Sequence, residues 1–184
     1  MFLITFLIAS NLVAENLTFW NPSKKIGVEI KIPAWTLEEK VVSKTENGIK
    51  EDGKLYSNIR IYQYDENPSM WEKFFSIQIE EDVKDPIQVF SDIQLRAYLN
   101  YCNRESLKYN VLKETKEQVV FNIFCPEYKK NKSTGEIAVF SMVRFKTYFV
   151  KTFQQWRGGE MLANDRSTWV ASDKELIEAL ESLS

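Results

Sequence analysis

The sequence predicts an α+β protein in which one antiparallel sheet of about six to eight strands is covered by one long and one short helix, as an α/β sandwich. Two observations support this prediction. Apolar and polar residues alternate with a period of two through most of the chain, and only two segments have the spacing of an amphipathic helix. Because a helix buries its apolar stripe on a neighbouring layer, both helices are expected to cover the sheet.

Four stretches of the first half are predicted to be strands: residues 26–32, Trp35 to about Lys44, 56–64 and 71–80. The first reads IGVEIKI, so its apolar residues share one face, and Pro33 ends it. The turn-forming pairs Asn47-Gly48 and Asp52-Gly53 predict a hairpin or loop over residues 46–54.

The long helix is predicted from Asp85-Pro86 to about Lys108. A spacing of 3.6 residues per turn places these side chains on its inner face: Ile87, Phe90, Ile93, Ala97, Tyr98 and Tyr101. Four acids stand before or at its start: Glu80, Glu81, Asp82 and Asp85. They are interpreted as solvated charges favoured by the helix dipole, and a metal or acid–base site is the alternative.

Strands are predicted to resume over residues 117–125, 136–145 and 147–156, with a polar turn at 129–135. The short helix follows, because Ser172 and Glu175 form a capping box before an apolar stripe made of Leu176, Ala179, Leu180 and Leu183. No repeat or linker interrupts the pattern. Residues 15–184 are therefore predicted to form a single domain.

This order of elements resembles the PsbP/DcrB-like group of small exported α/β sandwich proteins. The resemblance rests on the opening KIGVEIKIPAW, the long helix after the fourth strand, and the closing aromatic strands followed by TWVASDKELIEAL. It covers nearly the whole mature chain in element order and implies a non-catalytic exported protein. None of the group's functional residues can be placed on this sequence, which also lacks the lipidated cysteine of the lipoprotein members.

The first 14 residues, MFLITFLIASNLVA, are predicted to be a signal peptide. Their apolar run is too short to span a bilayer, which needs about 20 residues. Ala14 provides a small residue before a cut that leaves Glu15 as the mature N-terminus. The alternative is a buried N-terminal strand or helix in a cytosolic protein. The prediction implies a periplasmic or secreted protein with no stable membrane insertion after leader cleavage.

Cys102 and Cys125 are the only cysteines, and in an exported chain they are expected to form a disulfide. Cys102 falls late in the predicted long helix and Cys125 at the end of a predicted strand. The alternative is a pair of buried thiols that behave as small hydrophobic residues. If the bridge forms, neither sulfur can act as a nucleophile.

Histidine is absent, which excludes catalytic triads built on imidazole and zinc sites of the usual catalytic types. Neither a phosphate-binding nor a dinucleotide-binding glycine motif occurs. We therefore expect no enzyme activity, metal or cofactor, although a pair of carboxylates remains formally open among the 26 acids. A net charge of −2 gives no reason to expect a nucleic-acid partner.

Residues 154–169 contain the candidate partner-binding side chains Trp156, Arg157, Arg166 and Trp169. Trp and Arg dominate the energetics of protein interfaces. The alternative is that both tryptophans close the core over a sheet edge. The leading functional hypothesis is a non-enzymatic binding or accessory protein of the cell envelope that acts through protein–protein contacts. The other two are an immunity-type protein that neutralises an envelope-acting toxin and a carboxylate-based envelope hydrolase.

Overall fold

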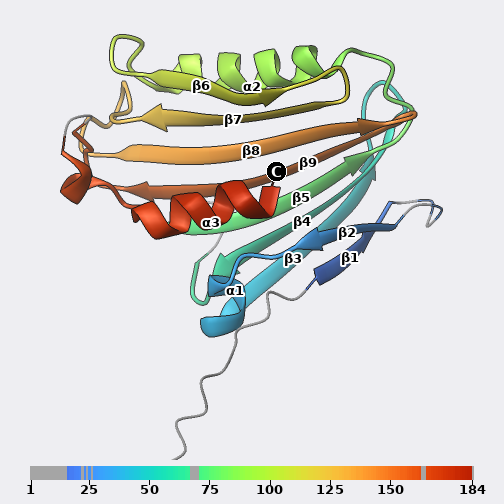
Figure 1. Ribbon diagram of the computed structural model, residues 1–184, viewed down its shortest axis with the longest axis horizontal. Helices are drawn as coiled ribbons and strands as arrows, with labels where there is room; N and C mark the ends of the chain where they lie inside the picture. Colours follow the sequence, from blue (N-terminus) through green and yellow to red (C-terminus); the bar gives the residue numbers. More distant parts are fainter. Residues whose placement is uncertain are drawn as a thin grey trace, which may run out of the picture.

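The structure is a computed structural model, which describes residues 16–21, 23, 25, 27–66, 71–162 and 165–183. The fold consists of a seven-stranded antiparallel sheet, a separate two-stranded sheet and the helices that pack on them (Figure 1). The elements are β1 (Asn16–Trp20), β2 (Gly27–Lys31), α1 (Trp35–Glu38), β3 (Val41–Ile49), β4 (Leu55–Gln63), β5 (Lys73–Glu80), α2 (Ile87–Tyr101), β6 (Lys108–Glu114), β7 (Gln118–Cys125), β8 (Gly135–Phe145), β9 (Tyr148–Gly158), the 3-10 helix η1 (Arg166–Thr168) and α3 (Asp173–Leu183). The predicted α+β class with a large antiparallel sheet is confirmed, whereas the small sheet and α1 were not predicted.

Strand β9 joins the two halves of the large sheet, whose order is β3-β4-β5-β9-β8-β7-β6. Strands β3 to β5 form one meander and β6 to β9 form another, and β9 pairs with both β5 and β8. The pairs Ile77↔Thr152 and Ser141↔Thr152 place residues of both halves on one row. The last strand therefore gives the two meanders one continuous core.

The two faces of the sheet are covered by different elements (Figure 1). On one side, which we call the α3 face, α3 crosses the sheet. The β1–β2 pair and α1 add core residues on the same side, such as Phe19, Ile30 and Trp35. On the opposite α2 face, α2 packs on β7 and β8 through Ile87 and Tyr98. Each helix thus buries its apolar stripe on the sheet, as two-layer packing requires.

A disulfide between Cys102 and Cys125 connects the end of α2 to the end of β7. The two Cα atoms lie 5.8 Å apart, and both residues are fully buried. The predicted bridge is therefore present in the structure, and it anchors the helix on the strand beneath it. Cys102 also pairs with Tyr128 in an isolated antiparallel bridge.

The region after β2 departs from the prediction, because Trp35 begins the short helix α1 and not a strand. Thr36 Oγ1 donates to the carbonyl oxygen of Pro33 at 2.7 Å, which closes this first turn. Strand β3 then extends through Asn47-Gly48, and the hairpin turn forms after it, with Gly53 at a φ of 81°. Gly48 lies over the Tyr56 ring, where a Cβ atom would be only 2.8 Å from a ring carbon, so close packing explains this glycine.

Helix α2 is shorter than predicted and turned about its axis. It ends at Tyr101, and the edge strand β6 begins at Lys108. Ile93 is 58% exposed and Ala97 is also exposed, so the predicted inner face is wrong at both positions. Ser91 is buried in their place. Ile87, Ser91, Tyr98 and the disulfide-bonded Cys102 follow one helical face, and this is the face that meets the sheet.

The acids before α2 are not all solvated, which corrects that interpretation. Glu80 is 4% exposed and its Oε1 lies 2.6 Å from Lys50 Nζ. Glu81 is also buried and accepts hydrogen bonds from Asn21 Nδ2 and from the backbone N–H of Ser23. The carboxylates thus hold neighbouring segments. Within the described residues, no group of three or more acids and cysteines is placed to hold a metal ion.

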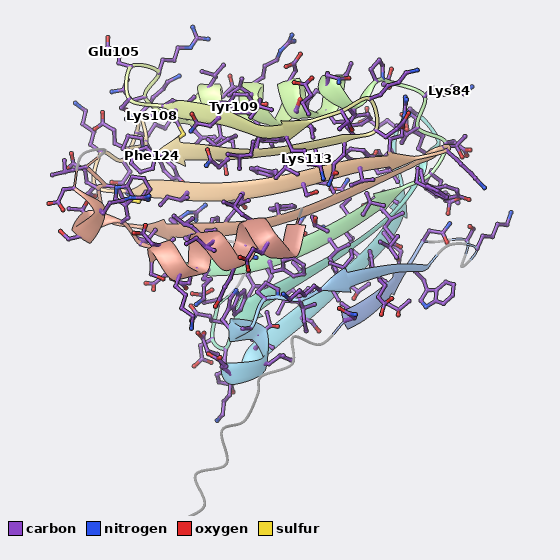
Figure 2. All side chains as sticks on the ribbon, viewed as in Figure 1. Lys84, Glu105, Lys108, Tyr109, Lys113 and Phe124 are labelled. Carbon is purple, nitrogen blue, oxygen red and sulfur yellow. A yellow bond between two sulfur atoms is a disulfide. The ribbon has the colours of Figure 1, made fainter. Side chains whose placement is uncertain are left out.

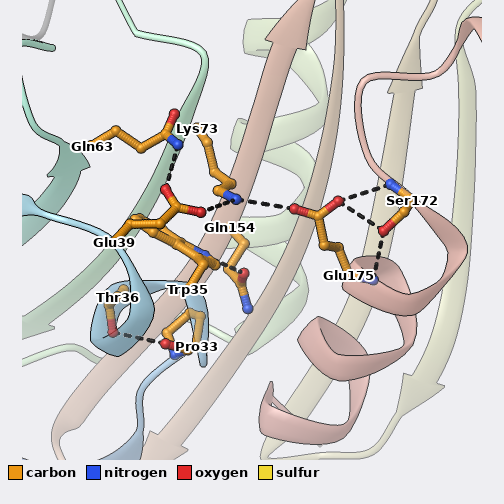
Figure 3. Close-up of polar contacts among 9 residues, drawn as sticks. All are labelled: Pro33, Trp35, Thr36, Glu39, Gln63, Lys73, Gln154, Ser172 and Glu175. Carbon is orange, nitrogen blue, oxygen red and sulfur yellow. Dashed lines mark hydrogen bonds and ion pairs between the residues drawn. The ribbon is translucent and has the colours of Figure 1, made fainter.

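A group of ion pairs centred on Lys73 of β5, which we call the polar clamp, joins the end of α1 to the first turn of α3 on the α3 face (Figure 3). Lys73 Nζ lies 3.2 Å from Glu39 Oε1 and 3.1 Å from Glu175 Oε1. Glu175 also accepts from the backbone N–H and the hydroxyl of Ser172, which confirms the predicted capping box. Burial raises the pKa of Glu175, but the bonds from Ser172 and Lys73 outweigh this effect and the pKa is lowered. The clamp therefore connects the first turn of α3 to β5 and to the end of α1.

None of the helices in the described ranges is long and apolar enough to cross a membrane. The predicted signal peptide, residues 1–14, and the predicted mature N-terminus at Glu15 lie outside the described residues.

Candidate functional site

The predicted binding segment is divided between the two faces of the sheet. Trp156 and Arg157 are consecutive residues of β9, so their side chains point to opposite faces. Trp156 lies in the core of the α3 face and is only 2% exposed, and no described acceptor bonds its Nε1. It is a core residue, which corrects its assignment as a contact residue. The reason is that β9 is the central strand, and its α3-side residues are covered.

Trp169 and Arg166 lie on the α3 face, around the 3-10 helix η1. Trp169 is half-buried, stacks on Phe124 with ring centroids 4.5 Å apart, and donates from Nε1 to the carbonyl oxygen of Leu162 at 2.9 Å. The guanidinium carbon of Arg166 lies 3.9 Å from the Trp169 ring centroid, and its Nη2 is 3.3 Å from Asp173 Oδ1. This pair remains accessible at the surface.

Trp169 and Arg166 line a groove of about 520 Å³ between α3 and strands β6 to β8, which we call the α3 groove. Lys108 and Phe124 face each other on β6 and β7 and lie side by side in the groove lining (Figure 2). The other residues that line it are Asn110, Asn122, Ile123, Ile137, Val139, Asp173, Leu176, Ile177 and Leu180. The floor and the α3 wall are thus mainly apolar, and the rim is polar.

The rim of the α3 groove leaves two groups open to a partner. Ile177, on the α3 wall, is 55% exposed. Lys108 is exposed and forms no ion pair with any residue in the described ranges. By contrast, Asn110 and Asn122 are bonded to each other at 3.0 Å. The groove therefore offers an exposed aliphatic side chain and a cation whose charge is not neutralised.

Arg157 lines a second pocket, of about 330 Å³, on the α2 face, which we call the Arg157 pocket. Its other lining residues are Arg60, Tyr62, Trp71, Phe74, Tyr101, Tyr128, Glu136 and Gln155. The guanidinium carbon of Arg157 lies 3.8 Å from the Trp71 ring centroid and 5.8 Å from that of Tyr128. Arg157 Nε also donates to Tyr128 Oη at 3.2 Å. Aromatic rings thus hold the guanidinium in a defined position.

Glu136 forms the floor of the Arg157 pocket, where its side chain is 2% exposed. Its carboxylate accepts hydrogen bonds from the hydroxyls of Tyr98 and Tyr128 and from Gln155 Nε2, the last at 2.8 Å. Arg157 Nη2 lies farther away, at 3.8 Å from Glu136 Oε2. Burial raises the pKa of Glu136, although these donors oppose the shift, and burial with the nearby carboxyl raises the pKa of Tyr98.

The two carboxylates that glycosidase chemistry requires are not combined in the Arg157 pocket, because Glu136 is the one acid among its lining residues. The pocket combines aromatic surface with two arginines, which is suited to binding.

Sequence reasoning missed Glu136, although a signal was present. In β8 it stands in phase with Ala138 and Phe140, which point into the core, so a charged residue at an inward position indicated a buried polar site.

Comparisons with known proteins show little similarity. No family model matches the chain, and no curated protein sequence matches it. Among solved structures, the Ran-binding protein Mog1p of Saccharomyces cerevisiae aligns with 8% sequence identity and a TM-score of 0.43, over 77% of this chain and 93% of that one. The resemblance to the PsbP/DcrB-like group is tested by none of these comparisons and stays a prediction.

Proposed function

We propose that this protein is an exported, non-enzymatic binding or accessory protein that contacts a protein partner through the α3 groove. The observation that supports this function is the accessible apolar wall that Leu176, Ile177 and Leu180 form beside the half-buried Trp169 ring. Interfaces concentrate their binding energy in a few aromatic, aliphatic and arginine anchors that meet in such depressions. Trp169 and Arg166 were singled out from the sequence, and both line the groove.

The groove favours a partner segment with apolar side chains and a neighbouring carboxylate. Ile177, Leu176 and Leu180 present aliphatic surface along α3, which matches apolar anchors. Lys108 at the rim has no ion-pair partner among the described residues, so an acidic side chain of the partner gains a charge-assisted contact there. The paired Arg166 and Asp173 add a polar border that favours one orientation of the segment.

Export is proposed from the leader-like first 14 residues together with the disulfide. Structural disulfides persist in oxidising compartments and are rare in the reducing cytosol. Cys102 and Cys125 are both buried in the bridge, which is typical of a structural disulfide and not of a redox-active one.

Affinity capture from the native cell envelope with two matched variants tests this function. Ile177→Arg places a charge on the groove wall, whereas Ile49→Arg places the same charge on β3, at the opposite edge of the sheet. Both residues are mostly exposed, so both variants are expected to melt within a few degrees of the wild type. Lys108→Glu reverses the charge at the rim and provides a second groove variant.

The proposal predicts that at least one protein captured by the wild type and by Ile49→Arg is lost with Ile177→Arg and weakened with Lys108→Glu. Loss of a central anchor reduces affinity by about 2 kcal/mol or more, which is roughly 30-fold. Cross-links of that partner should then map to α3 and β6. Equal capture by the wild type and both groove variants would show that the α3 groove is not the interface.

A further inference from the structure

We propose that the Arg157 pocket binds a small organic anion, specifically a flat aromatic ring that carries one carboxylate. This site lies on the α2 face, opposite the α3 groove, and is independent of the function proposed above. Its volume of about 330 Å³ suits a ligand of this size, because small-molecule pockets begin at about 300 Å³. The ligand class follows from the charge, the rings and the strand register of the pocket.

The charges of the pocket favour an anion. Arg60 and Arg157 both line it, and Glu136 is the one acid among the described residues of its lining. Arg60 is half-buried and has no carboxylate within ion-pair distance among the described residues. Glu136 is already occupied by two tyrosine hydroxyls and an amide, and it stands 3.8 Å from Arg157. Among the described residues one cationic charge thus remains without a counterion, and a single carboxylate neutralises it.

The strand register places the two arginines on either side of a shared row. Tyr62 of β4, Phe74 of β5 and Gln155 of β9 form one row across the sheet. On the same face, Arg60 lies two residues before Tyr62 in β4, and Arg157 lies two residues after Gln155 in β9, on the other side of this row. Two long basic side chains therefore approach the same aromatic floor from opposite directions. An anion over this row can accept hydrogen bonds from both guanidinium groups.

The rings favour a flat body for this anion. Trp71 and Phe74 pack edge to face with centroids 4.5 Å apart, and Tyr62 lies 5.4 Å from Phe74. Aromatic clusters with a nearby acid can also bind a quaternary ammonium ion. Here, however, the guanidinium of Arg157 already lies on the Trp71 face, so a cation of the protein occupies that position. The Trp71, Phe74 and Tyr62 rings are themselves buried, whereas Tyr101 and Tyr128 in the same lining are half-buried. A planar ligand instead stacks on these two tyrosine rings with its carboxylate toward the arginines.

Titration calorimetry of the disulfide-bonded protein with benzoate tests the proposal. Saturable binding is expected, with a Kd of about 1 mM or tighter for so small a probe. Arg60→Gln should weaken it at least tenfold, since a charge-assisted contact to the carboxylate is lost. Arg96→Gln, at an exposed position of α2, is the matched control and should bind like the wild type. Melting curves of both variants establish that they are folded.

Benzamide, choline and inorganic phosphate serve as comparison probes. Benzamide should bind far more weakly than benzoate, because it keeps the ring and lacks the charge. Choline binding in place of benzoate would identify a cation site, and phosphate binding as tight as benzoate would identify a general anion site; either result overturns the aromatic carboxylate. The proposal also fails if benzoate shows no saturable binding, or if Arg60→Gln binds it as tightly as Arg96→Gln.

Discussion

Loss of the disulfide is expected to reduce the free energy of unfolding by about 3 kcal/mol. Cys102 and Cys125 are separated by 23 positions. In the chain-entropy model, closing a loop of that length removes about 11 cal/mol/K of entropy from the unfolded chain, which is about 3 kcal/mol at 25 °C. The loop contains the edge strand β6, so the reduced protein should lose hydrogen-exchange protection first in β6 and in the last turn of α2.

Guanidinium unfolding measures this effect when it is recorded on the oxidised wild type, the reduced wild type and the double variant Cys102→Ala/Cys125→Ala. The reduced wild type keeps both buried sulfurs and reports the crosslink alone. The double variant also loses the packing of the sulfur atoms, so it should be slightly less stable than the reduced wild type. The oxidised protein should have the smallest dependence on denaturant, since its unfolded chain exposes less surface.

The entropic reasoning is refuted if the oxidised and reduced proteins unfold with the same free energy while mass spectrometry shows two free thiols in the reduced sample. In that case the crosslink does not restrict the unfolded chain. A difference much larger than about 3 kcal/mol would instead show that the bridge also holds α2 on β7 against strain or solvent entry.

Three further perturbations give distinct results. Trp156→Ala should cost about 3–5 kcal/mol in urea unfolding, because a ring that is 2% exposed leaves a cavity; a cost below about 1 kcal/mol would contradict its core position. Burial raises the pKa of Glu136 in the folded protein above its ordinary value, so between the unfolded and folded pKa values the folded state binds more protons. The free energy of unfolding of the wild type relative to Glu136→Gln should therefore fall as pH increases through that window. If this relative free energy instead increases with pH, the pKa of Glu136 is lowered in the folded protein. Ser172→Ala should cost about 1 kcal/mol, measured by thermal unfolding, through loss of the capping box with Glu175, and an unchanged melting temperature would argue against the cap.

Patterns that depend on near neighbours in the chain were predicted well. The alternation in residues 56–64, 71–80, 136–145 and 147–156 identified β4, β5, β8 and β9 to within about two residues, because a strand half-covered by a core shows its period directly. The capping box at Ser172 and the start of α3 are local in the same way. Edge strand β6 was missed, since most of its residues are exposed and it lacks that alternation.

The sequence by itself determined the α+β class, the pairing of its two cysteines, and the residue types available to any site, with histidine absent. Only the tertiary structure decided which of those residues meet. Trp156 and Arg157 are neighbours in the chain, yet the pleat of β9 buries one in the core and places the other above Glu136. Arg157 is far in the sequence from Arg60 and Trp71, and the antiparallel register of β4, β5 and β9 brings the three into one pocket. Which side chains share a site depends on strand order and register, and both are set by burial of the whole sheet and not by any local pattern.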